Sequence, residues 1–256
     1  MNFIDTHTHL FLEEFNKDRD LVIESAIAKG VNQFFLPNID SSSIDDLINL
    51  STKYPDNCFP MMGLHPTSVK ENFEEELELV EKYLEKEKFY GVGETGIDLY
   101  WDKTFIEEQE RAFRYQIKLA KKYKLPIIIH VRDSFDEVFK IVDELNDDSL
   151  TGIFHCFSGD YIQAEKIIGY KGFKLGIGGV ITFKNSNLSE IISKIDLQHI
   201  VLETDAPFLS PVPKRGRRNE SAYLIYIAQK IADLHNISIE TVAEISTKNA
   251  RQLFKI

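Results

Sequence analysis

Short apolar runs alternate with longer amphipathic segments along most of the chain. The runs are rich in Ile, Val, Leu and Phe, and they have the length of buried strands. We expect strands near Phe3–His7, Gln33–Pro37, Phe59–Gly63, Tyr90–Gly93, Ile127–His130, Gly152–His155, Phe173–Gly176 and Ile200–Glu203. Because segments with helical character separate these runs, the pattern predicts parallel strands joined by right-handed crossover helices.

Helical periodicity is clearest in two of the intervening segments. One apolar stripe contains Phe135, Val138, Phe139, Val142 and Leu145, and the other contains Ile106, Phe113, Ile117 and Ala120. Ser134 and Glu137 have the spacing of a capping box at the start of the first stripe, and Pro126 ends the second. The acidic run 71–87 predicts a further helix whose apolar positions Leu77 and Val80 face inward.

Two amphipathic segments follow the last expected strand. We expect helices over Tyr223–Leu234 and Ser238–Phe254, with Ser238 as the N-cap of the second, and we expect both to pack on the outside of the fold. The repeated strand and helix units point to a closed (β/α)8 TIM barrel in the α/β class, with a doubly wound open sheet as the alternative. The chain of 256 residues has no repeat or linker-like tract and suits one domain over residues 1–256.

Side chains with metal-binding chemistry stand at the ends of several expected strands. They are His7, His9, Glu94, His130, His155 and Asp205. His7 and His9 are two residues apart, so in a strand both would face the same side. The expected strands one, four, five, six and eight bring these groups to one mouth only if the sheet is closed, which favours the barrel. Because carboxylates are rarely buried unless they are paired or bind metal, the set predicts a metal site.

The number of candidate ligands indicates two ions. A single catalytic zinc ion normally takes about three protein ligands, fewer than are available here. Two divalent ions, with Glu94 as the shared carboxylate, would supply an activated hydroxide for displacement at phosphorus. Imidazole together with carboxylate suits Mg, Mn or Zn, so the identity of the metal stays open. We expect Glu94 and Asp205 to be catalytic, the second by taking a proton from water.

Several motifs resemble those of the TatD-type metal-dependent deoxyribonucleases, a family within the amidohydrolase superfamily. The segments concerned are FIDTHTHL at residues 3–10, GLHP with His65, GVGETGIDLYW at residues 91–101, HCFSG at residues 155–159 and ETDAPFLSPVPKRGRRNE at residues 203–220. The third of these has Thr95 and Ile97 where the more usual form has Ile and Leu. The resemblance covers nearly the whole chain.

This resemblance implies a barrel that hydrolyses phosphodiester bonds of DNA. It places His7, His9 and Asp205 on one metal ion and His130 and His155 on the other, with Glu94 shared. It also favours His65 as a donor to a phosphate oxygen, against a role in merely ending its strand. A barrel mouth admits a single strand or a frayed end more readily than the interior of a duplex, so the expected substrate is DNA in one of those forms.

Other side chains are candidates for substrate contact or support. Arg132 either pairs with a surface acid or grips a phosphate bidentately. Arg215 and Arg217 belong to a dense basic cluster, residues 214–218, which either is solvated loop or contacts a DNA backbone without regard to sequence. Glu203 is expected to support a neighbouring ligand without binding metal itself. Tyr100 and Trp101, just after the Glu94 motif, either stack an unpaired base or simply cover the barrel rim.

Composition narrows the setting more than the function. The net charge of −11 argues against a broadly basic surface, although bound cations and a local basic patch can still hold phosphate. Two cysteines give no disulfide framework, and no apolar run approaches the roughly 20 residues needed to span a bilayer. We therefore expect a cytoplasmic protein without membrane contact. Two alternatives to DNA hydrolysis are hydrolysis of a small phosphoester or cyclic amide with the same ions, and a metal-binding interaction module without catalysis.

Overall fold

Strands and helices alternate along the chain in the computed structural model, which describes residues 1–256. The strands are β1 (Phe3–Asp5), β2 (Val31–Pro37), β3 (Cys58–Met61), β4 (Val92–Asp98), β5 (Ile127–Arg132), β6 (Gly152–Phe154), β7 (Phe173–Ile177) and β8 (Ile200–Leu202). All their ladders are parallel, in the orders β1-β2-β3 and β4-β5-β6-β7-β8. A parallel bridge between Met62 and Val92 joins the two sheets, and Thr6 N donates to Leu202 O at 3.0 Å where β8 meets β1. The strands therefore close into the barrel that the sequence predicts.

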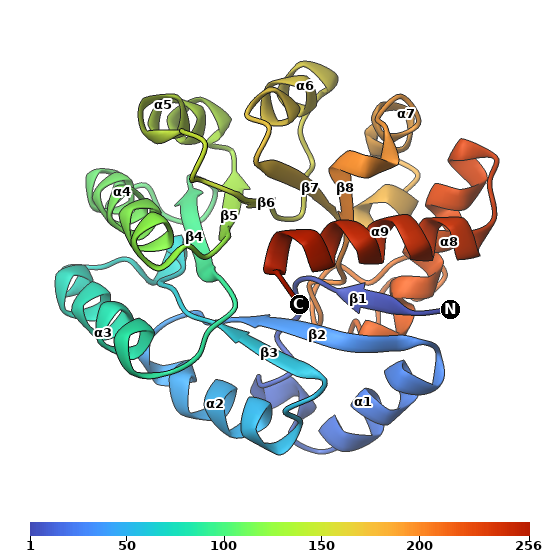
Figure 1. Ribbon diagram of the computed structural model, residues 1–256, viewed down its shortest axis with the longest axis horizontal. Helices are drawn as coiled ribbons and strands as arrows, with labels where there is room; N and C mark the ends of the chain where they lie inside the picture. The colour runs from blue at the N-terminus through green and yellow to red at the C-terminus, as the bar shows by residue number, and fades with distance from the viewer.

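Helices surround this barrel (Figure 1). They are α1 (Arg19–Ala28), α2 (Ile44–Lys53), α3 (Phe73–Lys86), α4 (Ile106–Tyr123), α5 (Phe135–Leu145), α6 (Tyr161–Gly169), α7 (Leu188–Ile192), α8 (Leu224–His235) and α9 (Ile239–Phe254). Short 3-10 turns are η1 (Glu13–Phe15), η2 (Ser41–Ser43), η3 (Pro66–Ser68), η4 (Gly179–Thr182), η5 (Leu197–His199) and η6 (Ser221–Tyr223). The acidic helix α3 buries Leu77 and Val80 as predicted. None of the helices has the length and apolar character needed to cross a bilayer.

The helix α9 closes one end of the barrel, and the expectation that it packs on the outside is wrong. Strand side chains that point into the barrel, such as Phe35 and Ile128, form a cluster with Ala250, Leu253 and Phe254 of α9. The Phe254 ring stacks on Phe35 with centroids 3.7 Å apart. Figure 1 shows α9 crossing the middle of the ring, whereas α8 lies in the outer layer as expected.

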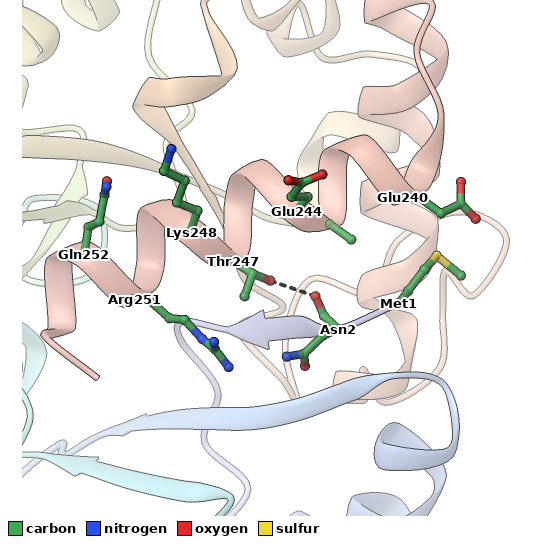
Figure 2. A pocket seen from close by; sticks show the side chains of 9 residues that line it. Met1, Asn2, Glu240, Glu244, Thr247, Lys248, Arg251 and Gln252 are labelled. Carbon is green, nitrogen blue, oxygen red and sulfur yellow. Dashed lines mark hydrogen bonds between the residues drawn. The ribbon is translucent and has the colours of Figure 1, made fainter.

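Polar side chains of α9 fix it to the amino-terminal ends of the strands. Thr247 Oγ1 donates to the carbonyl of Asn2 at 2.8 Å (Figure 2), and the Asn249 amide donates to the carbonyls of Leu197 and Ile200. These carbonyls precede or begin β1 and β8. Because α9 covers this end, the mouth at the carboxyl-terminal ends of the strands is the one left for a site.

Two helix starts were predicted with different success. Ser238 Oγ accepts a hydrogen bond from Thr241 N at 3.1 Å, which confirms the N-cap of α9. The capping box expected at Ser134 is wrong, although α5 does begin at the next residue. The Ser134 hydroxyl donates to Ile97 O of β4 at 2.6 Å and accepts from Arg132 N, so it ties α5 to two strands and makes no cap hydrogen bond.

Candidate metal centre

The structure brings all of the candidate ligands together at the carboxyl-terminal mouth of the barrel. Glu94 lies within β4 and His130 within β5, because these two strands pair as far as Asp98 and Arg132 and are longer than the sequence suggested. His155 follows β6 directly, and Asp205 follows β8. A cavity of about 670 Å³ opens over these side chains.

His7 and His9 reach the site from beyond a strand. Because β1 ends at Asp5, the argument that strand periodicity places both on one face is wrong. Hydrogen bonds hold the segment instead: His9 N donates to Ala206 O at 2.7 Å, and Asp205 N donates to His7 O at 2.9 Å. Both imidazoles are buried, and their Nε2 atoms lie 3.2 Å apart.

Glu94 is at the centre of the cluster, and its two oxygens face different imidazoles. Its Oε2 lies 3.0 Å from His7 Nε2 and 3.6 Å from His9 Nε2. Its Oε1 lies 2.8 Å from His130 Nδ1 and 3.6 Å from His155 Nε2. The carboxylate therefore separates the imidazoles into two groups.

Asp205 faces the first group and approaches the second. Its Oδ1 lies 3.5 Å from His9 Nε2, 3.7 Å from His7 Nε2 and 3.9 Å from His155 Nε2. The residue has a φ of +57°, in the left-handed region that Asp tolerates better than most side chains do. The turn is closed by Phe208 N, which donates to Asp205 O at 2.8 Å.

His65 lies in direct contact with the candidate metal ligands, although the sequence suggested only a contact with substrate. Its Nε2 is 3.3 Å from Glu94 Oε1, the same oxygen that His130 contacts. Its Nδ1 accepts a hydrogen bond from Thr67 N at 3.1 Å, which orients the ring. His65, Glu94 and His130 form one of the groups whose ligand atoms all lie within 4.8 Å of one another, so His65 is placed for either metal binding or phosphate contact.

Asp98 is a site residue that the sequence reasoning missed. Its Oδ2 accepts a hydrogen bond from His130 Nε2 at 2.9 Å, so both ring nitrogens of His130 contact carboxylates. Its Oδ1 accepts from Tyr100 N and Trp101 N at 3.0 and 3.2 Å. Asp98 stands four residues after Glu94, and the strand periodicity of two that puts both on one face was the available signal.

Glu203 lies behind His155. Its Oε1 is 2.8 Å from His155 Nδ1 and accepts a hydrogen bond from Cys156 N at 2.6 Å. Gly176 makes room for this carboxylate, because a Cβ at that position would lie 2.2 Å from Glu203 Oε2. The contact leaves His155 Nε2 directed at the cluster, as expected for a side chain that orients a ligand.

Burial and crowding shift the proton affinities of these groups in opposite directions. Burial would raise the pKa of Glu94, but the charges of His65, His7 and His155 hold that pKa well below its usual range. Burial would lower the pKa of His155, but the carboxylates of Glu203 and Glu94 raise it to about 10. The pKa of His7 is lowered, mainly by burial.

The donor set fits divalent cations. His7 Nδ1 and His9 Nδ1 are buried without a hydrogen-bond partner, while the two Nε2 atoms face each other beside Glu94. Two facing imidazole nitrogens satisfy at most one hydrogen bond, whereas a cation between them and the carboxylate would use both lone pairs. Imidazoles and carboxylates in this arrangement are the ligands that Zn and similar ions take in proteins.

The candidate substrate-binding arginines differ in their distance from the cavity: one lines it and the others do not. Arg132 lines the cavity with its guanidinium over the Tyr100 ring, and none of the ion pairs in the structure includes it, so the expected alternative of a surface acid partner is not found. Arg215 lies over the Phe183 ring at 3.9 Å, Arg217 is exposed, and neither lines the cavity. Arg218 pairs with Asp18 and Glu220, so this member of the basic cluster ties the loop to the barrel.

Comparisons with known proteins agree with this arrangement. Residues 4–255 match the family described as TatD related DNase. The chain is 38% identical over 253 residues to an uncharacterized metal-dependent hydrolase, YabD, of Bacillus subtilis, covering 98% of each chain. The crystal structure of YjjV, a TatD homologue of Escherichia coli, superposes with a TM-score of 0.93 at 30% identity, covering 99% of this chain and 98% of that one. A TatD family hydrolase of Entamoeba histolytica shares the fold with a TM-score of 0.85 at 22% identity, covering 99% and 98%.

The barrel, the cluster at its mouth and these relatives define a metal-dependent hydrolase. The chain belongs to the TatD family.

Proposed function

We propose that this protein hydrolyses phosphodiester bonds of DNA with two divalent ions. The observation that carries the proposal is the position of Glu94, whose two oxygens face two separate groups of imidazoles in an open cavity. His7, His9 and Asp205 would hold one ion, His130 and His155 the other, and Glu94 would contact both. Two such ions would supply a hydroxide nucleophile at neutral pH and would stabilise the charge that develops on the phosphodiester oxygens.

The remaining steps belong to side chains of the protein. Burial would raise the pKa of Asp205, but the imidazoles of His9 and His155 lower it, so the carboxylate is ionised. An ionised carboxylate at this position can accept a proton from the attacking water. Glu203 holds His155 in orientation, and Asp98 does the same for His130. The Arg132 guanidinium, which has no carboxylate partner, is free to bind a phosphate beside the one that reacts.

The shape of the site favours a single strand or a frayed end. Glu94 is buried at the base of the cavity, and a volume of about 670 Å³ lies in the range that encloses a small ligand. A stacked duplex is a poor fit to such a cavity, whereas one terminal nucleotide with its phosphate fits. The cytoplasmic location expected from the sequence stays a prediction.

The second candidate function is hydrolysis of a small phosphoester or cyclic amide. The enclosed volume favours it, because a small substrate also fits the cavity. The two functions differ in what lies outside the cavity, since only a polymer reaches Arg215 and Arg217. A metal-binding module without catalysis is disfavoured, because structural sites are closed and this cluster opens into a cavity.

Removal of metal is expected to abolish hydrolysis reversibly while the fold persists. The barrel has its own large apolar core, which does not depend on the ions. Protein depleted with a chelator should not cleave end-labelled single-stranded DNA, and a panel of Mg²⁺, Mn²⁺ and Zn²⁺ should restore cleavage. Circular dichroism of the same samples checks the fold. Undiminished cleavage by protein shown to contain no metal would contradict the proposal.

Charge reversal at Arg215 and Arg217 is expected to weaken DNA binding and flatten its dependence on salt. Each lost contact with single-stranded phosphate should reduce the slope of log K against log salt by about 0.7. Hydrolysis of bis(p-nitrophenyl) phosphate should stay nearly unchanged, because neither arginine lines the cavity.

The matched control reverses Lys29 and Lys86, two exposed lysines at the carboxyl-terminal ends of α1 and α3. These helix ends lie at the closed end of the barrel, so the same change in net charge should leave DNA binding intact. Equal losses on DNA and on the small diester would place Arg215 and Arg217 in the catalytic machinery or the fold.

A further inference from the structure

Two large aromatic side chains are exposed beside the cavity. Tyr100 is 55% and Trp101 is 69% exposed, directly after β4. The two rings meet edge to face with centroids 5.0 Å apart, and Trp101 lines the cavity. The guanidinium carbon of Arg132 lies 3.9 Å from the Tyr100 ring centroid and 5.3 Å from that of Trp101. We call Tyr100, Trp101 and Arg132 the aromatic platform.

A role in covering the barrel rim does not explain this platform. A side chain that seals a rim buries its own surface against the residues below, and both rings leave more than half of theirs in water. Exposure of so much apolar surface is unfavourable, and clustered exposed aromatics mark binding sites. The Arg132 guanidinium covers one face of the Tyr100 ring, whereas most of Trp101 is exposed, so the Trp101 ring and the Arg132 donors remain available to a ligand.

The platform is held at a fixed position relative to the metal centre. Asp98 Oδ1 accepts hydrogen bonds from Tyr100 N and Trp101 N, and Asp98 Oδ2 accepts from His130 Nε2. Asp98 N in turn donates to Gln109 Oε1 of α4 at 2.9 Å. One buried carboxylate thus sets both the orientation of a candidate metal ligand and the start of the aromatic segment.

A further apolar edge lies across the mouth. Phe208 and Leu209 follow Asp205, line the cavity and are 47% and 37% exposed. In a closed barrel of eight strands, β4 and β8 stand on opposite sides, so these residues face the platform across the opening. A chain entering the cavity passes between two apolar edges.

We propose that the aromatic platform stacks an unpaired nucleobase of the DNA substrate while Arg132 binds an adjacent phosphate. This inference rests on the proposed function, and it makes the aromatic platform the feature that selects single-stranded DNA. A base in a duplex is already stacked and paired, whereas an unpaired base has a free face for Trp101. Stacking of this kind tolerates any base, so the platform distinguishes single-stranded from double-stranded DNA and does not read the sequence.

Trp101 provides a direct readout, because it is the only tryptophan of the chain. The metal-loaded protein is titrated with a single-stranded oligonucleotide whose phosphorothioate linkages slow hydrolysis. Intrinsic fluorescence should be quenched by this strand, and much less by a blunt duplex of the same sequence or by a strand with abasic residues at its ends. Equal quenching by base-bearing and abasic strands would overturn the stacking assignment.

Variants test the same inference through kinetics. Trp101→Ala should raise KM for single-stranded DNA by about 5- to 100-fold with little change in kcat, and Trp101→Phe should restore most of the loss. Bound metal per chain, measured by elemental analysis, should not change, because Trp101 is not one of the candidate ligands. The matched control is Tyr123→Ala, which removes a ring that also lies under a cation, Lys122, but at the far end of α4.

The outcomes separate this inference from the proposed function. Wild-type cleavage of DNA with unaltered KM in Trp101→Ala overturns the platform alone. If the wild-type protein cleaves no DNA, the proposed function fails, and the fluorescence titration decides by itself whether the platform binds unpaired bases. Loss of bound metal or of the folded state in Trp101→Ala would also overturn the inference, because it would place Trp101 in the metal centre or in the fold.

Discussion

Asp205→Asn is expected to lose about 10²–10⁴-fold in turnover, the usual range for general acid–base catalysis, while it keeps much of its metal and DNA binding. Asparagine preserves the shape of the side chain and one oxygen ligand, but it does not accept a proton. The native carboxylate contacts imidazoles of both groups, so it stands where a reacting water must be oriented. Single-turnover rates at saturating metal measure the chemical step without the contribution of product release.

The comparison variant is Glu203→Gln. Glu203 touches His155 from behind and does not line the cavity, so its loss should slow the reaction less than the loss at Asp205. The glutamine keeps an oxygen that can face His155 Nδ1. A mild defect in Asp205→Asn beside a severe defect in Glu203→Gln would transfer the proton-handling role to Glu203.

Glu94→Ala is expected to lose both metal ions, whereas His155→Ala is expected to lose mainly one. The reason is the geometry of the two Glu94 oxygens, one facing His7 and the other facing His130. Removing this carboxylate also leaves several buried imidazoles without a counter-charge, which further weakens cation binding. Elemental analysis of the purified variants gives the number of ions per chain.

Two controls make this result interpretable. His199→Ala removes an imidazole of η5, outside the site, and should retain the metal content of the wild type. Circular dichroism should show a folded barrel for every variant. Wild-type metal content and turnover in Glu94→Ala would disprove the shared position of Glu94.

The barrel and the clustering of candidate ligands were predictable from the sequence for one physical reason. Buried parallel strands read as short apolar runs, and the carboxyl ends of the strands in a closed barrel converge on one mouth. Glu94, His130 and His155 each follow or end such a run, so their proximity followed from the strand order alone. Polar side chains at the ends of apolar runs were therefore enough to predict which residues cluster at the mouth.

Other features depended on tertiary contacts that a linear pattern does not contain. His7 and His9 meet because their segment hydrogen-bonds to the turn around Asp205, nearly two hundred residues away in the chain. Asp98 was missed because a single acid near aromatic residues looks like an ordinary loop residue until His130 is seen beside it. Periodicity shows that α9 has an apolar face, but not whether that face packs on the outside or closes the barrel.

The most direct test of the two-ion DNA hydrolase is a titration of metal-depleted protein with Mn²⁺ or Zn²⁺. Bound metal per chain and cleavage of end-labelled single-stranded DNA are measured on the same samples. We expect binding to level off at two ions per chain and cleavage to rise with the second. Full cleavage at one bound ion per chain would contradict the shared two-ion centre. Two bound ions without cleavage of any DNA would contradict the proposed substrate.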